Sequence, residues 1–257
     1  MKFLISFLLR KIPRKYLQLI GHKALRIVAI FYIGNKVQCP ICEAQFSKFL
    51  PYGRLKSRSN ALCPKCLSLE RHRLIWLYLK EKTDFFVSEK KMLHIAPEHC
   101  FIDRFESMKS LNYLTADIES PLAKIKMDIH NIPLKDNSVD VVFCNHVLEH
   151  VDDDIRALKE IKRVLKPLGW AILQIPFFYP LREKTYENKR ITDPKEREKV
   201  FGQDDHVRLY GKDYGDRLSS VGFEVFAENF AKELPSQIIK KYALPSKEII
   251  YKVLKAG

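Results

Sequence analysis

The first feature of this chain is an absence: no acidic residue occurs before Glu43. Residues 1–82 carry 17 Lys and Arg against 3 Asp and Glu, whereas residues 83–257 carry 28 of each sign. The excess of positive charge is therefore confined to the N-terminal third, and the rest of the chain is neutral. Such a basic segment predicts an anionic partner, either nucleic acid or an acidic membrane surface. A basic face that is only solvated is the alternative.

Long hydrophobic runs are also missing. No stretch reaches the roughly 18–20 uninterrupted apolar residues that a membrane-spanning helix needs. Residues 3–9 are apolar, but Arg10 and Lys11 follow at once without a small-residue cleavage site, which argues against a secretory signal. Only six cysteines occur, and four of them form two Cys-x-x-Cys pairs, a metal pattern rather than a disulfide framework. We therefore expect a cytoplasmic protein, peripheral to a membrane at most.

Residues 1–36 form a first segment, in which apolar residues such as Leu17, Ile20 and Ile27 recur at helical spacing. The spacing predicts a basic amphipathic helix over about 14–32. A helix of this type can lie in the interface of an anionic membrane. It can equally pack on the domain that follows, and the sequence leaves both readings open.

Residues 37–82 form a cysteine module that ends in a predicted helix over 69–82. Two Cys-x-x-Cys pairs separated by 20 residues allow four sulfurs to surround one ion, which predicts a structural Zn²⁺ site. An iron centre or a redox dithiol is the alternative. Nine Lys or Arg residues and interleaved aromatics could bind RNA, although such aromatics also form the core of small zinc modules. The expected metal ligands are Cys39, Cys42, Cys63 and Cys66.

From about residue 90 short apolar strands alternate with helical patterns, which predicts an α/β fold with a doubly wound, mostly parallel sheet. We assign residues 83–257 to this domain. Residues 178–215, rich in charge and Tyr, fit neither period and are interpreted as an inserted lid. The expected strands span residues 92–96, 113–116, 139–143, 171–175, 223–226 and 249–254, with a helix that starts at residues 152–154.

Glycine is absent from residues 93–99, the loop after the first strand, where nucleotide-binding folds usually have it. Three later segments nevertheless resemble class I S-adenosylmethionine (SAM)-dependent methyltransferases of the type 11 group: residues 128–133, 145–150 and 166–169. The resemblance is greatest to enzymes related to ubiquinone and menaquinone biosynthesis, especially a subgroup preceded by a cysteine module. It implies a Rossmann-like sheet of seven strands and SAM as cofactor.

The resemblance also implies a cofactor site. Asp117, 23 residues after His94, would accept the ribose hydroxyls. Asp128 would receive the adenine amino group. Alternatively, each of these two carboxylates could only stabilise the backbone turn in which it lies. The remaining expected contacts are His94, Ala96 and Glu98 in the first loop, Ile129 against the adenine ring, and Asn145 and His146 near the methionine part.

A hydroxyl or amine acceptor can need a proton acceptor that works near pH 7, the natural range of histidine. His146 and His150 follow the fourth strand, and His206 lies in the lid. We favour His206, with Asp205 to orient its ring. Arg208 and Tyr210 are expected to position an anionic or sugar-like substrate. The alternative is a structural lid whose polar groups bind one another.

Three functions follow in order of preference. The first is a SAM-dependent methyltransferase for a small-molecule or glycan-type acceptor, because the catalytic part carries no excess charge. The second is an RNA methyltransferase that binds RNA through the basic zinc module. The third is a non-catalytic scaffold protein, which the absence of glycine from the loop at residues 93–99 suggests. The sequence identifies neither the acceptor nor the oligomeric state.

Overall fold

The computed structural model describes residues 27–53 and 57–257, which divide into two compact units. Unit 1 contains the described residues up to Phe86 together with residues 98–107 and 229–248, and unit 2 contains residues 87–97, 108–228 and 249–257. Most of the helix predicted over 14–32 falls outside the described residues. Within those residues, no helix has the length and apolarity that a bilayer crossing requires. The boundaries predicted after residues 36 and 82 remain proposals.

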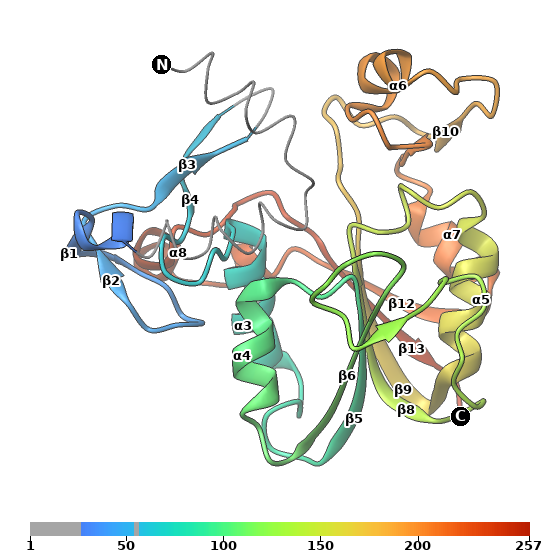
Figure 1. Ribbon diagram of the computed structural model, residues 1–257, viewed down its shortest axis with the longest axis horizontal. Coiled ribbons are helices and arrows are strands. Elements are labelled where there is room, and N and C mark those ends of the chain that lie inside the picture. Colours follow the sequence, from blue (N-terminus) through green and yellow to red (C-terminus); the bar gives the residue numbers. More distant parts are fainter. Residues whose placement is uncertain (1–26, 54–56) are drawn as a thin grey trace. The chain divides into compact units, whose positions relative to one another are not determined.

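Unit 2 is built on a seven-stranded sheet (Figure 1) with the order β12-β13-β9-β8-β5-β6-β7. The five strands from β9 to β7 pair in parallel, whereas β13 pairs antiparallel with β9 and β12. The expected α/β fold with a mostly parallel, seven-stranded sheet is confirmed. The strands are β5 (Lys90–Ile95), β6 (Leu111–Asp117), β7 (Ile125–Lys126), β8 (Val139–Asn145), β9 (Leu165–Gln174), β12 (Phe223–Glu228) and β13 (Ile250–Lys255).

One face of this sheet packs against α5 (Asp154–Val164) and α7 (Tyr214–Ser220), and alternate strand residues such as Leu93 and Ile95 enter the shared core. The helix α5 starts where the Asp153 side chain accepts a hydrogen bond from the Arg156 amide at 2.9 Å. It ends at Val164, because Leu165 adopts an extended conformation and begins β9. The chain therefore passes from α5 into β9 without an intervening loop.

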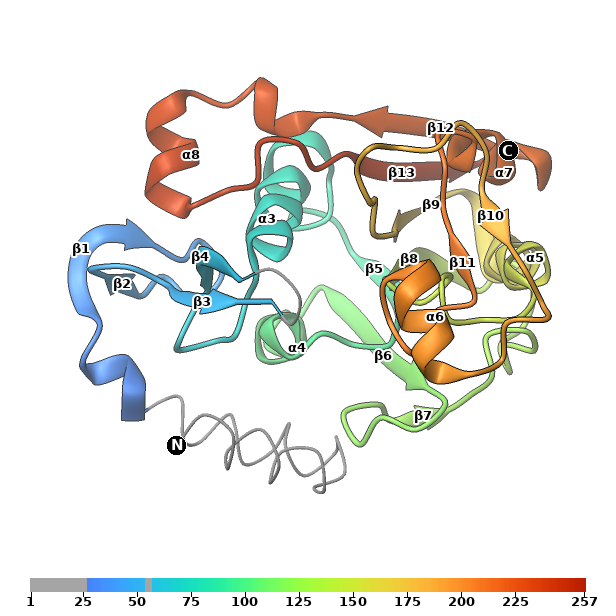
Figure 2. The ribbon, with the colours of Figure 1, turned by 90° about the horizontal axis from the view of Figure 1, so that it is seen from above.

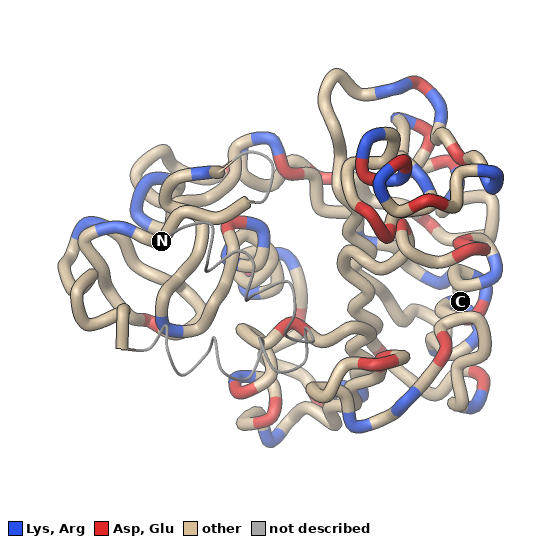
Figure 3. Tube along the Cα trace, turned by 45° about the horizontal axis from the view of Figure 1, so that its top comes forward, with Lys and Arg blue, Asp and Glu red and all other residues tan. Residues whose placement is uncertain are grey.

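The predicted lid, residues 178–215, has structure of its own in unit 2. The strands β10 (Tyr186–Glu187) and β11 (Arg208–Leu209) pair antiparallel (Figure 2), and α6 (Pro194–Phe201) lies between them in the sequence. Asp193 caps α6, and Gly202 ends it with a φ of 88°, a conformation that glycine adopts without strain. Figure 3 shows both signs of charge interspersed along this part of the chain.

Unit 1 combines two small antiparallel ribbons with helices. An aromatic core joins α3 to α4, because Trp76 stacks on Phe101 and Phe105 with centroid distances of 6.3 and 6.0 Å. Tyr78, also on α3, meets Phe230 edge-on at 5.4 Å. The elements are β1 (Ile33–Gln38), β2 (Gln45–Phe46), β3 (Leu50–Tyr52), β4 (Arg58–Leu62), α3 (Glu70–Lys82), α4 (His99–Glu106), the 3₁₀ helix η1 (Phe230–Lys232) and α8 (Ser236–Tyr242).

Candidate functional site

The carboxyl ends of three parallel strands bring three of the expected cofactor residues to one edge of the sheet of unit 2. Ile95 of β5 lies opposite Ala116 of β6 and Cys144 of β8. The residues that follow, Ala96, Asp117 and Asn145, therefore share this edge. In open parallel sheets such an edge is where ligands bind.

The loop after β5 begins with a residue in the left-handed region. Ala96 has a φ of 51°, and its amide donates to the carbonyl of Ala116 at 2.9 Å. Glycine reaches this conformation without the strain that a Cβ imposes. The backbone turn that glycine usually makes is thus present here without glycine, and its tie to β6 places it beside Asp117.

Asp117 and Asp128 lie at adjacent strand ends. The amide of Met127 donates to the carbonyl of Asp117 at 2.9 Å, directly after the two-residue strand β7. Asp117 Oδ1 accepts from the amides of Glu119 and Ser120 at 2.7 and 2.6 Å, and Oδ2 takes part in neither bond. Residues 118–124 form turns instead of a helix, which brings the two acids close despite their separation of only 11 positions.

Asp128 begins the loop between β7 and β8, and its side chain is 56% exposed. Its Oδ1 accepts from the His130 amide at 2.9 Å and lies 2.8 Å from His130 Nδ1. The hydrogen bond from this amide, followed by the interaction with the His130 ring, lowers the pKa of Asp128. Unlike the exposed Asp128, Ile129 is buried and belongs to the core of unit 2.

His94 is not at this edge, and Glu98 belongs to unit 1. His94 is fully buried within β5, on the face opposite Leu93 and Ile95, and its Nδ1 lies 2.7 Å from the Tyr113 hydroxyl. Glu98 precedes α4 in unit 1, and its carboxylate lies 3.9 Å from His72 Nε2. These contacts give His94 a structural role in the sheet, and they leave cofactor contact by Glu98 as a proposal.

The turn after β8 places three ionisable side chains together. His146 has a φ of 56°, and its amide donates to the Gln174 carbonyl at 2.8 Å. Its Nδ1 lies 3.4 Å from Glu149 Oε1, and the Glu149 side chain is only 2% exposed. Burial pulls the pKa of Glu149 upward, but the hydrogen bond with His146 and the nearby charge of His146 and His150 outweigh it, so the pKa is lowered.

His206 reaches the same turn from the lid. The amide of Val207 donates to the Glu149 carbonyl at 2.9 Å, and the His206 ring meets the His150 ring edge-on at 4.7 Å. His206 is fully buried, and this burial lowers its pKa. Its Nδ1 lies 3.2 Å from the Phe201 carbonyl, so the proton belongs on Nδ1 and Nε2 carries the lone pair.

Asp205, which was expected to orient the His206 ring, lies near the neighbouring ring of His150. Asp205 Oδ2 lies 3.5 Å from His150 Nδ1, and the His206 nitrogen that such a carboxylate would orient faces the Phe201 carbonyl instead. The orientation of His206 by Asp205 stays a prediction.

Arg208 and Tyr210, for which substrate contact stays a prediction, lie within the structure of unit 2. Both side chains are 2% exposed. The Arg208 guanidinium donates to the carbonyls of Leu148, Val151 and Asp152. The Tyr210 hydroxyl donates to Asp154 Oδ2 at 2.8 Å. These bonds fasten the lid to the turn after β8, which is a positioning role.

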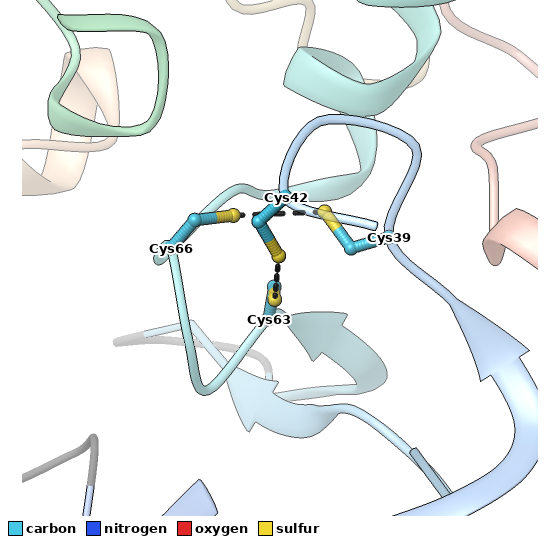
Figure 4. Close-up of side chains that lie close together, drawn as sticks. All are labelled: Cys39, Cys42, Cys63 and Cys66. Carbon is cyan, nitrogen blue, oxygen red and sulfur yellow. Dashed lines mark hydrogen bonds between the residues drawn. The ribbon is translucent and has the colours of Figure 1, made fainter. Parts of the chain in front are cut away.

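In unit 1 the four predicted ligands come together (Figure 4). Cys39 Sγ lies 3.5 Å from Cys66 Sγ, and Cys42 Sγ lies 3.7 Å from Cys63 Sγ. A tetrahedron with Zn–S bonds of about 2.3 Å has sulfurs about 3.8 Å apart. The arrangement thus fits a Zn²⁺ ion with four thiolates and no open position.

Two equivalent turns hold these cysteines. The amides of Glu43 and Leu67 donate to the carbonyls of Cys39 and Cys63 at 2.8 and 2.9 Å. Glu43 and Leu67 both have a φ near the left-handed value, 62° and 61°. The Ser68 hydroxyl lies 3.2 Å from Cys39 Sγ, where it can stabilise a thiolate.

The sequence analysis missed Arg73, a fully buried side chain of α3. Its guanidinium lies 4.3 Å from the Phe49 ring centroid and donates to five carbonyl oxygens around the cysteine turns and the end of α8. Its position on the apolar face of the predicted helix was the available clue. The five acceptors belong to Asn60, Ala61, Ser68, Tyr242 and Ala243.

Comparison with known proteins adds a family match. Residues 89–173, about a third of the chain, match a family model described as a methyltransferase domain. This stretch contains the adjacent acids Asp117 and Asp128 and the turn after β8. Over this stretch the chain is therefore similar to methyltransferase domains.

Curated relatives match only in part, and the aligned stretches cover less than half of each. A tRNA U34 carboxymethyltransferase of Nautilia profundicola is 34% identical over 87 residues, 34% of this chain and 27% of that protein. An uncharacterised methyltransferase of Schizosaccharomyces pombe is 28% identical over 123 residues, 46% of this chain and 43% of that protein.

Two solved structures were also matched. A Burkholderia thailandensis 1,6-didemethyltoxoflavin-N1-methyltransferase with bound S-adenosylhomocysteine gives a TM-score of 0.49 at 12% identity, covering 73% of this chain and 78% of that one. A putative methyltransferase in complex with the Haloferax volcanii Trm112 activator gives a TM-score of 0.48 at 15% identity, covering 73% of this chain and 91% of that one. The fold assignment rests on the strand order given above.

Proposed function

We propose that the protein is a SAM-dependent methyltransferase that acts on a small-molecule or glycan-type acceptor. The observation that carries this proposal is the placement of Asp117 and Asp128 at adjacent strand ends, on the edge where Ala96 makes its left-handed turn. Asp117 keeps Oδ2 outside its turn bonds, so it has an acceptor to offer to ribose hydroxyls. Asp128, largely exposed and with a lowered pKa, is an ionised acceptor for an adenine amino group.

Titration calorimetry of the full chain with SAM tests this assignment. Asp117→Ala should weaken SAM binding by at least about 10-fold, the equivalent of about 1.4 kcal/mol for a lost hydrogen bond to a charged group. Glu119→Ala is the matched control, because it removes the same charge two positions later. Equal affinity of both variants would contradict the ribose role of Asp117.

SAM, when bound, would supply an electrophilic methyl group on sulfur. The chain would align acceptor and donor, a contribution that can reach roughly 7–11 kcal/mol of the barrier. His206 is the proposed proton acceptor, because its Nε2 carries a lone pair and burial keeps the ring neutral near pH 7. Under this proposal His206→Gln lowers kcat far more than SAM affinity, and an equal loss of both would contradict it.

The cysteine module is proposed to hold one structural Zn²⁺ ion. The four sulfurs and the Ser68 hydroxyl fit that ion, and a closed thiolate shell leaves no position for chemistry. Metal analysis of the purified chain should find one zinc per chain, and iron in its place would change the assignment.

RNA methylation is the second candidate. The observation that favours it is the partial similarity to an enzyme named for tRNA, together with the basic cysteine module. RNA binding that weakens steeply with salt would support it. Contact between residues 1–36 and an anionic membrane is a separate proposal, which sedimentation with phosphatidylserine vesicles tests.

A further inference from the structure

The turn after β8 and the lid together form a second group of metal-ligand side chains, far from the cysteines in sequence. One ligand atom from each of Glu149, His150 and His206 lies within 4.8 Å of the others. All three residues belong to unit 2. We propose that these three side chains bind a divalent first-row transition-metal ion.

The first argument is that buried ligand atoms lack partners. Glu149 Oε2 and His206 Nε2 are buried and make no hydrogen bond within the part of the chain that the structure describes. Glu149 is 1% exposed and His206 is 0% exposed. A buried polar atom without a partner destabilises the folded state, and more so when it is charged. Two such atoms directed into one cluster indicate a ligand that completes it.

The second argument is that the other polar atoms of these residues are already held. His206 Nδ1 faces the Phe201 carbonyl at 3.2 Å, and His150 Nδ1 faces Asp205 at 3.5 Å. Glu149 Oε1 lies 3.4 Å from His146 Nδ1. Metal-binding histidines characteristically engage their second nitrogen with a carbonyl or a carboxylate, which fixes the ring and its tautomer. The outer contacts of such a site are therefore in place.

The third argument concerns rigidity. Arg208 fastens the lid to the carbonyls of Leu148 and Val151, on both sides of Glu149 and His150. The Val207 amide adds a bond to the Glu149 carbonyl. The ligands from the two segments are thus held together without an ion, which lowers the entropy lost when one binds.

The ligand set indicates the class of ion. Two imidazoles and one carboxylate suit Zn²⁺, Mn²⁺, Fe²⁺ or Co²⁺ and leave coordination positions open. An Nε2 that binds a cation cannot also accept a proton. The metal site therefore competes with the proposed base role of His206, and metal binding that depends on His206 would argue against that role.

Mn²⁺ is the appropriate probe, because thiolates select softer ions and the zinc-loaded cysteine site will not take it. Titration of the full, zinc-loaded chain is followed by the electron paramagnetic resonance signal of free Mn²⁺. One ion per chain should bind. Glu149→Gln and His206→Gln should each weaken binding by more than about 10-fold, since even outer contacts contribute about 10–100-fold. His99→Gln, a histidine of unit 1, is the matched control and should bind as the wild type does.

Circular dichroism and SAM affinity of each variant distinguish loss of the ion from loss of the fold or of the cofactor site. Pulsed resonance on the Mn²⁺-loaded wild type adds a readout that needs no variant: nitrogen couplings from bound imidazole are expected. Absence of Mn²⁺ binding at millimolar concentration, unchanged binding in both variants, or a spectrum without imidazole nitrogen would overturn the proposal.

Discussion

The two clusters of potential metal ligands differ in how the chain assembles them. In unit 1 each pair of cysteines comes from one tight turn, and both turns use the same backbone hydrogen bond. In unit 2 His150 and His206 are 56 residues apart in the sequence, and bonds from Arg208 and Val207 attach the lid to the turn after β8. A metal site whose ligands are close in sequence can be recognised from their spacing, whereas a site assembled by tertiary contacts cannot.

The largest effect is expected for Cys63→Ser, which breaks the locally assembled site. Free energies of about 10–16 kcal/mol accompany zinc binding in such modules, so loss of one thiolate should unfold this one. Hydrogen exchange should show lost protection around residues 37–66, and metal analysis should show lost zinc. Cys144→Ala, at a buried cysteine of the sheet, is the control and should retain the metal. Full zinc content in Cys63→Ser would contradict the assignment.

Asp154→Asn tests the tertiary assembly. The Asp154 carboxylate is 3% exposed, pairs with Arg217 at 2.6 Å and accepts from Tyr210. Removing one partner of such a buried pair costs about 3–5 kcal/mol. Urea unfolding should show this loss for Asp154→Asn, whereas Asp152→Asn, at an exposed neighbour, should stay within about 0.5 kcal/mol of the wild type.

The same pair predicts a pH dependence. Burial raises the pKa of Asp154, but the hydrogen bond with Arg217 and the charges of Arg208 and Arg217 lower it by more, so it lies below its ordinary value of 3.8. The stability from this carboxylate is therefore present above that value and is lost as the pH falls through the lower, folded-state pKa. The stabilities of wild type and Asp154→Asn should converge in acid, and a constant difference would contradict this.

Arg73→Met tests how far one buried side chain stabilises unit 1. The change leaves five carbonyl oxygens without their donor, and each buried polar group that stays unsatisfied costs about 1–3 kcal/mol. Because water can reach some of these groups, we expect a loss of about 2–4 kcal/mol in urea unfolding. Arg71→Met on the same helix is the control. Equal stability of the two variants would show that Arg73 does not organise the module.

Ala96→Gly should have the smallest effect, and of opposite sign. Glycine accommodates a φ of 51° better than alanine, and relief of this strain is worth about 1 kcal/mol or less. Thermal unfolding should show a small stabilisation with SAM affinity retained. A destabilisation would mean that the alanine side chain makes contacts that outweigh the strain.

Much of the fold was predictable because the apolar pattern marks six of the seven strands of the sheet: the strand predicted over 139–143 is β8, Val139–Asn145. The resemblance to methyltransferases pointed to Asp117 and Asp128, whose cofactor roles stay predictions. The sequence did not reveal that Arg208 is buried, because a charged residue in a polar lid is ordinarily solvated. Nor did it reveal the contact of Asp205 with His150, because adjacency to His206 in the sequence does not fix which ring a carboxylate meets.

Calorimetric titration of the wild-type chain with SAM tests the central claim most directly. The account predicts one binding site per chain in unit 2, with S-adenosylhomocysteine competing for it. Absence of any binding heat or thermal shift at millimolar SAM would contradict a methyltransferase and favour a protein whose sheet has lost its cofactor.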